Sequence, residues 1–177
     1  MTTNPQLLYA ILSMDAYHQG APGGLRDLLL QYPSEIDDTI RSTPRADNAI
    51  GFSAQSYTRG GETIIVYRGT DDGGTTGPLA AYQSLDVANG YFIAAGAAWN
   101  PQTQAAVAFY QSFLNGQNPT TASNITLVGQ SLGGGLAGYV GSLYGRQYYV
   151  YDSQPYLSAV GNAYALAQLD STFSGEI

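Results

Sequence analysis

The chain has 177 residues, enough for a single domain with a substantial buried core. Its net charge is −7 with only six Lys and Arg residues, which argues against nucleic acid or an anionic membrane as a partner. It contains no cysteine and one histidine, which excludes disulfides, thiolate metal sites and histidine-rich metal sites. We therefore expect no metal and no cofactor.

The N-terminal stretch MTTNPQLLYAILSMDAYHQ lacks a basic region, and its apolar residues are spaced rather than continuous. We expect no signal peptide in this stretch and no stable insertion into a membrane. Charged residues make up 11% of the chain, and glycine is abundant. This composition is typical of some bacterial extracellular proteins, and it is the sole basis on which we expect an extracellular location.

The first half of the chain predicts a helix followed by a β-hairpin. Asn4 and Pro5 are typical of a helix start, and apolar residues at helical spacing extend the helix to Gly20. A second, short helix is predicted over 25–32. The stretch 49–59 alternates loosely, a Gly-Gly turn follows at 60–61, and ETIIVYRG returns as a strand. Because its TIIVY core is apolar without alternation, we expect that strand to be buried on both faces.

The second half predicts alternating helices and strands. A polar, Gly-rich loop covers 70–78, and the small apolar stretch that follows it has no clear type. Asn100 and Pro101 are typical of a helix start. The predicted elements then alternate: a helix at 104–114, a strand at 125–129, a helix at 132–144, a strand at 147–151 and a helix at 158–169. This order predicts an α/β fold with a mostly parallel sheet flanked by helices, in one domain covering 1–177.

The segment NITLVGQSLGGGLAGYV contains a G-x-S-x-G motif centred on Ser131. In this motif a nucleophilic serine occupies a sharp turn from a strand to a helix, and its neighbours two residues away must be small. The motif stands here between an apolar strand pattern and a helical pattern, which is its expected context. The N–H of Leu132 would then be one oxyanion donor. The alternative is a Gly-rich turn that only packs a helix closely against a sheet.

GQSLGGGLAGY resembles the G-[HQ]-S-L-G-G-x-L-A elbow of the class 3-type lipases, a branch of the α/β-hydrolases. VYRGT, at 66–70, resembles the turn that ends a hairpin strand upstream of the elbow in that family. The resemblance implies that Thr70 supplies a second oxyanion donor through its backbone N–H. Looser similarities lie at Asp86, in SLDVANGY, and at 161–168. The family implies a three-layer fold in which the sheet includes an antiparallel hairpin.

The catalytic base is the main departure from this family, whose Asp and His follow the elbow, because no His follows Ser131 in this chain. Three alternatives are open. In the first alternative, His18 of the N-terminal helix is the base, since triads are defined by geometry and not by chain order. Alternatively, the missing residues lie beyond Ile177, which we favour because the sequence stops after a helix where further strands are expected. In the third alternative, the scaffold binds without turnover.

The catalytic acid is also open. Asp152 follows the predicted strand QYYVY, where some α/β-hydrolases carry this residue, but it is also typical of a turn in DSQP. Asp170, after the last helix, is the other candidate. Asp71 and Asp72 are expected to shape the oxyanion loop rather than to react.

Residues 73–99 lie where class 3-type lipases place a lid. Their large apolar side chains either line an acyl pocket or belong to the ordinary core; they are Leu79, Tyr82, Tyr91, Phe92, Ile93 and Trp99.

The sequence therefore predicts a serine ester hydrolase, lipase- or esterase-like, that acts on a small-molecule ester or lipid through an acyl-enzyme on Ser131. One alternative is a non-catalytic or truncated hydrolase-like module without a complete triad. Another is acyl transfer to an acceptor other than water. If the chain is truncated, an exposed sheet edge or apolar surface near its C-terminus should favour self-association.

Overall fold

The structure is a computed structural model, and it describes residues 5–18, 40–41, 45–47, 49–70, 88, 90–115 and 124–169. The helix predicted at 25–32 and most of the loop predicted at 70–78 lie outside these ranges.

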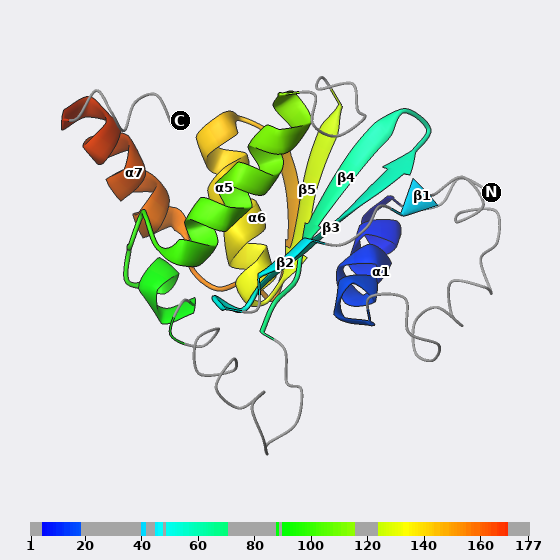
Figure 1. The fold of residues 1–177 in the computed structure, drawn as a ribbon, viewed down its shortest axis with the longest axis horizontal. Helices are drawn as coiled ribbons and strands as arrows, with labels where there is room; N and C mark the ends of the chain where they lie inside the picture. The colour runs from blue at the N-terminus through cyan, green and yellow to red at the C-terminus, as the bar shows by residue number, and fades with distance from the viewer. Residues whose placement is uncertain are drawn as a thin grey trace, which may run out of the picture.

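In the described part of the chain, six strands form one mixed sheet (Figure 1). They are β1 (Ile40–Arg41), β2 (Arg45–Asp47), β3 (Phe52–Arg59), β4 (Glu62–Tyr67), β5 (Ile125–Gln130) and β6 (Gln147–Tyr151). The order across the sheet is β1-β3-β4-β5-β6, and β2 pairs with β3 beside β1. Strands β4, β5 and β6 run parallel, as the helix–strand alternation predicted, and β3 runs antiparallel to β4.

The hairpin between β3 and β4 forms as the sequence predicted. Gly60 and Gly61 have φ angles of 53° and 83°, and Arg59 pairs with Glu62 across the turn. Positive φ at both central residues is the geometry of a tight hairpin turn, and glycine adopts it without steric cost. Residues 63–67 of β4 are all buried, so the predicted burial of this strand on both faces is confirmed.

Helices cover both faces of the sheet. Helix α1 (Pro5–His18) lies on one face, while α5 (Pro101–Leu114) and α6 (Leu132–Tyr144) lie on the other (Figure 1). Helix α7 (Leu157–Leu169) packs against α6. The layered α/β arrangement predicted from the sequence is thus present.

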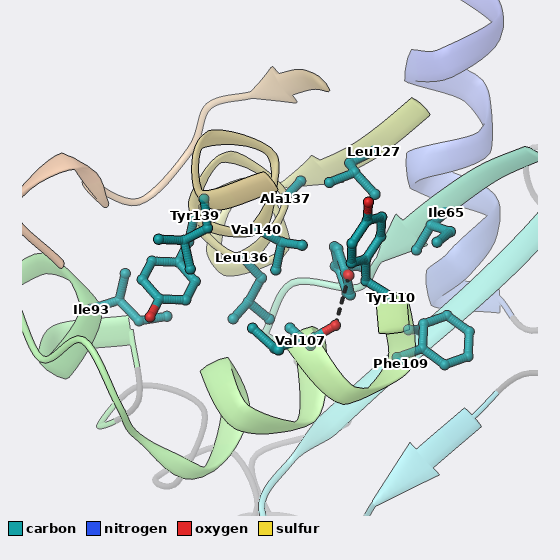
Figure 2. Close-up of a cluster of buried hydrophobic side chains, with 14 of the residues drawn as sticks. Ile65, Ile93, Val107, Phe109, Tyr110, Leu127, Leu136, Ala137, Tyr139 and Val140 are labelled. Atoms are coloured by element: carbon teal, nitrogen blue, oxygen red, sulfur yellow. Dashed lines mark hydrogen bonds between the residues drawn. The ribbon is translucent and has the colours of Figure 1, made fainter. Parts of the chain in front are cut away.

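Alternate residues of the buried strands fill two separate apolar cores. Ile64, Val66 and Val128 pack with Leu8 and Leu12 of α1. On the opposite face, side chains of α5 and α6 point toward β4 and β5 (Figure 2). The labelled strand residues there are Ile65 and Leu127, and the helix residues include Val107, Tyr110, Leu136 and Val140. The period of two along each strand therefore divides its side chains between the two layers.

Helix α5 begins with a complete capping box. The Asn100 side chain accepts hydrogen bonds from the N–H groups of Gln102 and Thr103, at 2.9 and 3.0 Å. The Asn100 N–H in turn donates to the Thr103 hydroxyl at 2.8 Å, and Pro101 occupies the first turn. The helix start predicted at Asn100 and Pro101 is confirmed, with an additional partner in Thr103.

Two glycines of α6 allow the helix to lie close to β6 and to the segment that follows it. A Cβ added to Gly138 would lie 2.3 Å from the Tyr156 ring, and one added to Gly141 would lie 2.4 Å from the Tyr148 ring. Helix α6 contains five glycines, and each costs a helix about 1 kcal/mol relative to alanine. Close packing against these two aromatic rings favours glycine at positions 138 and 141.

None of the described helices combines the length and apolar character needed to cross a bilayer.

Candidate functional site

Ser131 lies at the junction between β5 and α6 in a backbone conformation that few residues other than glycine adopt. Its φ is 55° and its ψ is −125°, between strand residue Gln130 and helix residue Leu132. A serine with positive φ at a strand-to-helix turn carries backbone strain, which persists only where the surroundings impose it. A sharp strand-to-helix turn at the serine is what the G-x-S-x-G spacing predicts, and we call residues 129–133 the elbow.

The two glycines of the motif are required by backbone contacts. A Cβ on Gly129 would lie 2.1 Å from the Gly133 carbonyl oxygen. A Cβ on Gly133 would lie 2.1 Å from the Tyr67 carbonyl oxygen and 2.7 Å from the carbonyl carbon of Arg68. The turn can therefore close, and α6 can approach β4, only with no side chain at either position.

Hydrogen bonds from two other segments fix the backbone of Ser131. Its N–H donates to the carbonyl of Tyr151, at the end of β6, at 3.0 Å. Its carbonyl accepts from the N–H of Gln154 at 3.0 Å and from the N–H of Gly135 at 3.1 Å. The elbow is thus held between the end of β6 and the first turn of α6, which provides the constraint that the strained conformation needs.

The end of β4 lies directly beside the elbow. Tyr67 pairs with Gly129 in the parallel register, so the residues after β4 and β5 emerge at the same edge of the sheet. A Cβ on Gly69 would lie 2.6 Å from the Gln130 carbonyl oxygen and 3.2 Å from Cβ of Ser131. Thr70, partly buried, is the next residue along the chain. The YRGT turn and Ser131 therefore lie side by side.

The start of α6 supplies backbone donors at this edge. Leu132 is the first helical residue, and its side chain is buried. N–H groups in the first turn have no acceptor within the helix, and the positive end of the helix dipole lies there. The position of Leu132 immediately after Ser131 is therefore suited to an oxyanion donor.

Sequence reasoning missed the contact of Tyr17 with this site. The Tyr17 hydroxyl donates to Oε1 of Gln130 at 2.6 Å, across 113 positions of the sequence. The same hydroxyl lies 2.1 Å from the position that a Cβ on Gly69 would occupy. The position of Tyr17 near the end of a helix gives no sign of either contact, because both depend on how α1 packs on the sheet.

His18 is the last residue of α1 and follows Tyr17 directly. The hydrogen bond between Tyr17 and Gln130 holds the end of α1 beside the elbow, and the backbone of His18 lies at that end of the helix. The His18 side chain lies outside the described residues.

Asp152 is the first residue after β6 and is exposed, with a φ of 46°. Its neighbours reach the elbow, since Tyr151 and Gln154 both bond to the backbone of Ser131. Asp tolerates the left-handed conformation because its short side chain can bond locally, which agrees with the turn interpretation. The other acidic residues considered from the sequence, Asp71, Asp72, Asp86 and Asp170, lie outside the described residues.

Partial burial raises the pKa of the Tyr151 hydroxyl, and a nearby negative charge on Tyr149 would raise it further. The Tyr151 hydroxyl donates a hydrogen bond to the Gln6 carbonyl at 2.6 Å. This bond fixes the first turn of α1 to the end of β6.

The described part of the predicted lid segment divides between core and surface. Ile93 is fully buried in the main core, and Trp99 packs against that core. Tyr91 and Phe92 instead expose 73% and 53% of their surface. A Cβ on Gly90, next to them, would contact Leu132 at 3.6 Å, so this segment adjoins the elbow. Leu79 and Tyr82 lie outside the described residues.

No group of three or more potential metal ligands occurs among the described residues. Comparisons with models of protein families, with curated proteins and with solved structures find no match for this chain.

Proposed function

We propose that the protein is a serine ester hydrolase of lipase or esterase type, with an α/β-hydrolase-like site. The observation that carries this proposal is the strained backbone of Ser131, at φ 55° and ψ −125°, between two glycines that tolerate no Cβ. A turn that only packed a helix against a sheet would place glycine at the strained position itself, because glycine adopts positive φ without cost. A serine kept there is best explained by the chemistry of its hydroxyl.

The proposed reaction begins with attack of the Ser131 hydroxyl oxygen on the ester carbonyl. A base takes the Ser131 proton as the bond to the carbonyl carbon forms, and the N–H groups of Leu132 and Thr70 hold the oxyanion of the tetrahedral intermediate. The intermediate collapses as the ester C–O bond breaks, and the protonated base returns the proton to the leaving alkoxide. Water then attacks the acyl-enzyme and releases the acid. Helix α6 contributes its positive N-terminal end to both intermediates.

His18 is the only imidazole in the 177 residues, and α1 ends at the elbow, which supports it as the base. Asp152 begins the segment that bonds to the backbone of Ser131, which supports it as the acid.

The test uses a fluorophosphonate probe and a short-chain p-nitrophenyl ester. The wild-type protein is expected to react covalently with the probe at Ser131 and to hydrolyse the ester. Ser131→Ala should lose both activities while remaining folded. Equal turnover by the wild-type protein and Ser131→Ala would refute the proposal.

His18→Ala, measured in parallel, identifies the base. If His18 removes the serine proton, this variant should lose turnover by a factor of roughly 10³ or more. Full activity in His18→Ala would exclude His18 as the base while leaving Ser131 as the nucleophile.

A non-catalytic hydrolase-like module is the second candidate, and the single histidine of the chain is the observation in its favour. A serine without a base retains some reactivity from the oxyanion hole but loses several powers of ten. This candidate predicts a folded wild-type protein whose ester turnover does not exceed that of Ser131→Ala.

A further inference from the structure

Three segments of the chain meet at the hydroxyl group of Tyr17. The hydroxyl belongs to α1, its acceptor is the side chain of Gln130 at the end of β5, and it faces the backbone of Gly69 after β4. Gln130 directly precedes Ser131, and Gly69 directly precedes Thr70. The hydroxyl therefore contacts the immediate neighbours of the nucleophile and of the Thr70 donor.

These contacts leave little freedom in the spacing of the two turns. The hydrogen bond measures 2.6 Å, and the space beside Gly69 is too small for a methyl group because the hydroxyl lies 2.1 Å from its position. The Gln130 carbonyl oxygen and Cβ of Ser131 close the same space from the other side. The backbone of Gly69 is thus enclosed between the Tyr17 hydroxyl on one side and the elbow on the other.

We propose that Tyr17 is a positioning residue that holds the YRGT turn against the serine elbow and so sets the spacing of the oxyanion donors. This inference rests on the proposed function, since it assigns Tyr17 a part in the same reaction. Oxyanion donors act only at about 2.7–3.1 Å from the oxygen they stabilise, so a small displacement of Thr70 reduces their effect. Tyr17 itself touches neither the substrate nor the reacting atoms in this proposal.

Simple anchoring of α1 to the sheet is the competing explanation, and the chain offers a matched control for it. The Tyr9 hydroxyl, on the same helix, donates to Glu62 at 2.8 Å at the other end of the sheet. Tyr9→Phe and Tyr17→Phe each remove one hydroxyl group that bonds α1 to the sheet. Only Tyr17→Phe changes a group beside the elbow.

The first measurement is the rate of covalent reaction with a fluorophosphonate, together with kcat and KM for the p-nitrophenyl ester. Tyr17→Phe should react about tenfold more slowly and lower kcat with little change in KM, because it affects the transition state more than binding. Tyr9→Phe should react at the wild-type rate. Equal rates for Tyr17→Phe and Tyr9→Phe would overturn the proposal.

A double variant tests whether Tyr17 acts through Gln130. Gln130→Met removes the acceptor while keeping a side chain of similar length. If both residues act as one unit, Tyr17→Phe combined with Gln130→Met should be no slower than the slower single variant. Multiplied effects in the double variant would contradict this coupling.

A measurement independent of activity separates this proposal from the proposed function. In ¹H–¹⁵N spectra, Tyr17→Phe should shift the amide signals of Thr70 and Leu132 and speed their hydrogen exchange, whereas Tyr9→Phe should not. Unchanged amides in Tyr17→Phe would refute the positioning role even if Ser131 is reactive. If the amide signals shift in Tyr17→Phe but the wild-type protein does not react with the probe, the positioning role is supported and the proposed hydrolase function is refuted.

Discussion

Ser131 shows how a single residue depends on contacts with several elements. Its strained φ is held by the hydrogen bond that its N–H donates to the Tyr151 carbonyl, by the one that its carbonyl accepts from Gln154, and by the absence of side chains at Gly129 and Gly133. The G-x-S-x-G spacing alone predicts this conformation, because a sharp strand-to-helix turn at the serine requires small residues two positions before and after it. The partners that hold it, at the end of β6, could not be identified from the motif.

A methyl group at Gly133 should destabilise the protein and inactivate the elbow. Its Cβ would meet the backbone of Tyr67 and Arg68, which cannot rotate away, so Gly133→Ala should cost about 1–3 kcal/mol of unfolding free energy. The same change at Gly161 meets nothing within 4 Å inside α7 and should stabilise by about 0.5–1 kcal/mol. Urea unfolding of both variants checks this, and equal effects at the two sites would contradict it.

At the scale of elements, local signals in the sequence located the hairpin, α5 and the strand–helix turn. The Gly-Gly turn, the Asn100 cap and the apolar periods each determine backbone conformation within a few residues. The layer that each helix covers depends on packing over long sequence distances. Thus α1 lies against β4 and β5 on the face opposite α6, which no short segment encodes.

The capping box of α5 should contribute measurably to stability. Asn100→Ala leaves the N–H groups of Gln102 and Thr103 without their side-chain acceptor and should lower the unfolding free energy by about 1 kcal/mol. Asn100→Asp keeps an acceptor and places negative charge at a helix N-terminus, so it should retain most of the stability. Thermal unfolding of the two variants tests this, and equal losses would show that the cap acceptor is unimportant.

At the scale of the whole molecule, charged residues are few and tyrosines are abundant, and several tyrosine hydroxyls form hydrogen bonds within the fold. The Tyr67 hydroxyl, fully buried, donates to the Ala106 carbonyl at 2.9 Å, and that of Tyr139 donates to the Ala98 carbonyl. Burial raises the pKa of both groups well above the ordinary value. The sequence shows the abundance of tyrosine but not which hydroxyls become buried.

Stability should therefore fall at alkaline pH. The pKa of Tyr67 is higher in the folded state than in the unfolded state, so its contribution is complete below about pH 10. It is lost as pH rises above that value, by about 1.4 kcal/mol per pH unit while only the unfolded tyrosine ionises. Urea unfolding at pH 9 and pH 11 measures this loss. Tyr67→Phe should lose less stability than wild type over that interval, and an equal loss would exclude Tyr67 as its source.

The surface near the C-terminus should support self-association. Helix α7 exposes several large apolar residues, with 69% of Leu157 and 85% of Leu169 accessible. Sedimentation equilibrium should show concentration-dependent association, weakened by Leu157→Lys with Leu169→Lys. Leu7→Lys, at an exposed site on α1, is the matched control and should not weaken it. A monomer at all concentrations would disprove the prediction.

The sequence by itself determined the alternation of elements, the hairpin turn, the start of α5 and the serine elbow, because each follows from steric and hydrogen-bonding demands within a few residues. Only the tertiary structure decided that the turn after β4 lies against Ser131, that Ile93 belongs to the core, and that the Tyr17 hydroxyl bonds to Gln130. These contacts join residues that are tens of positions or more apart. They depend on parallel register and on the packing of helices against the sheet, for which no local pattern exists.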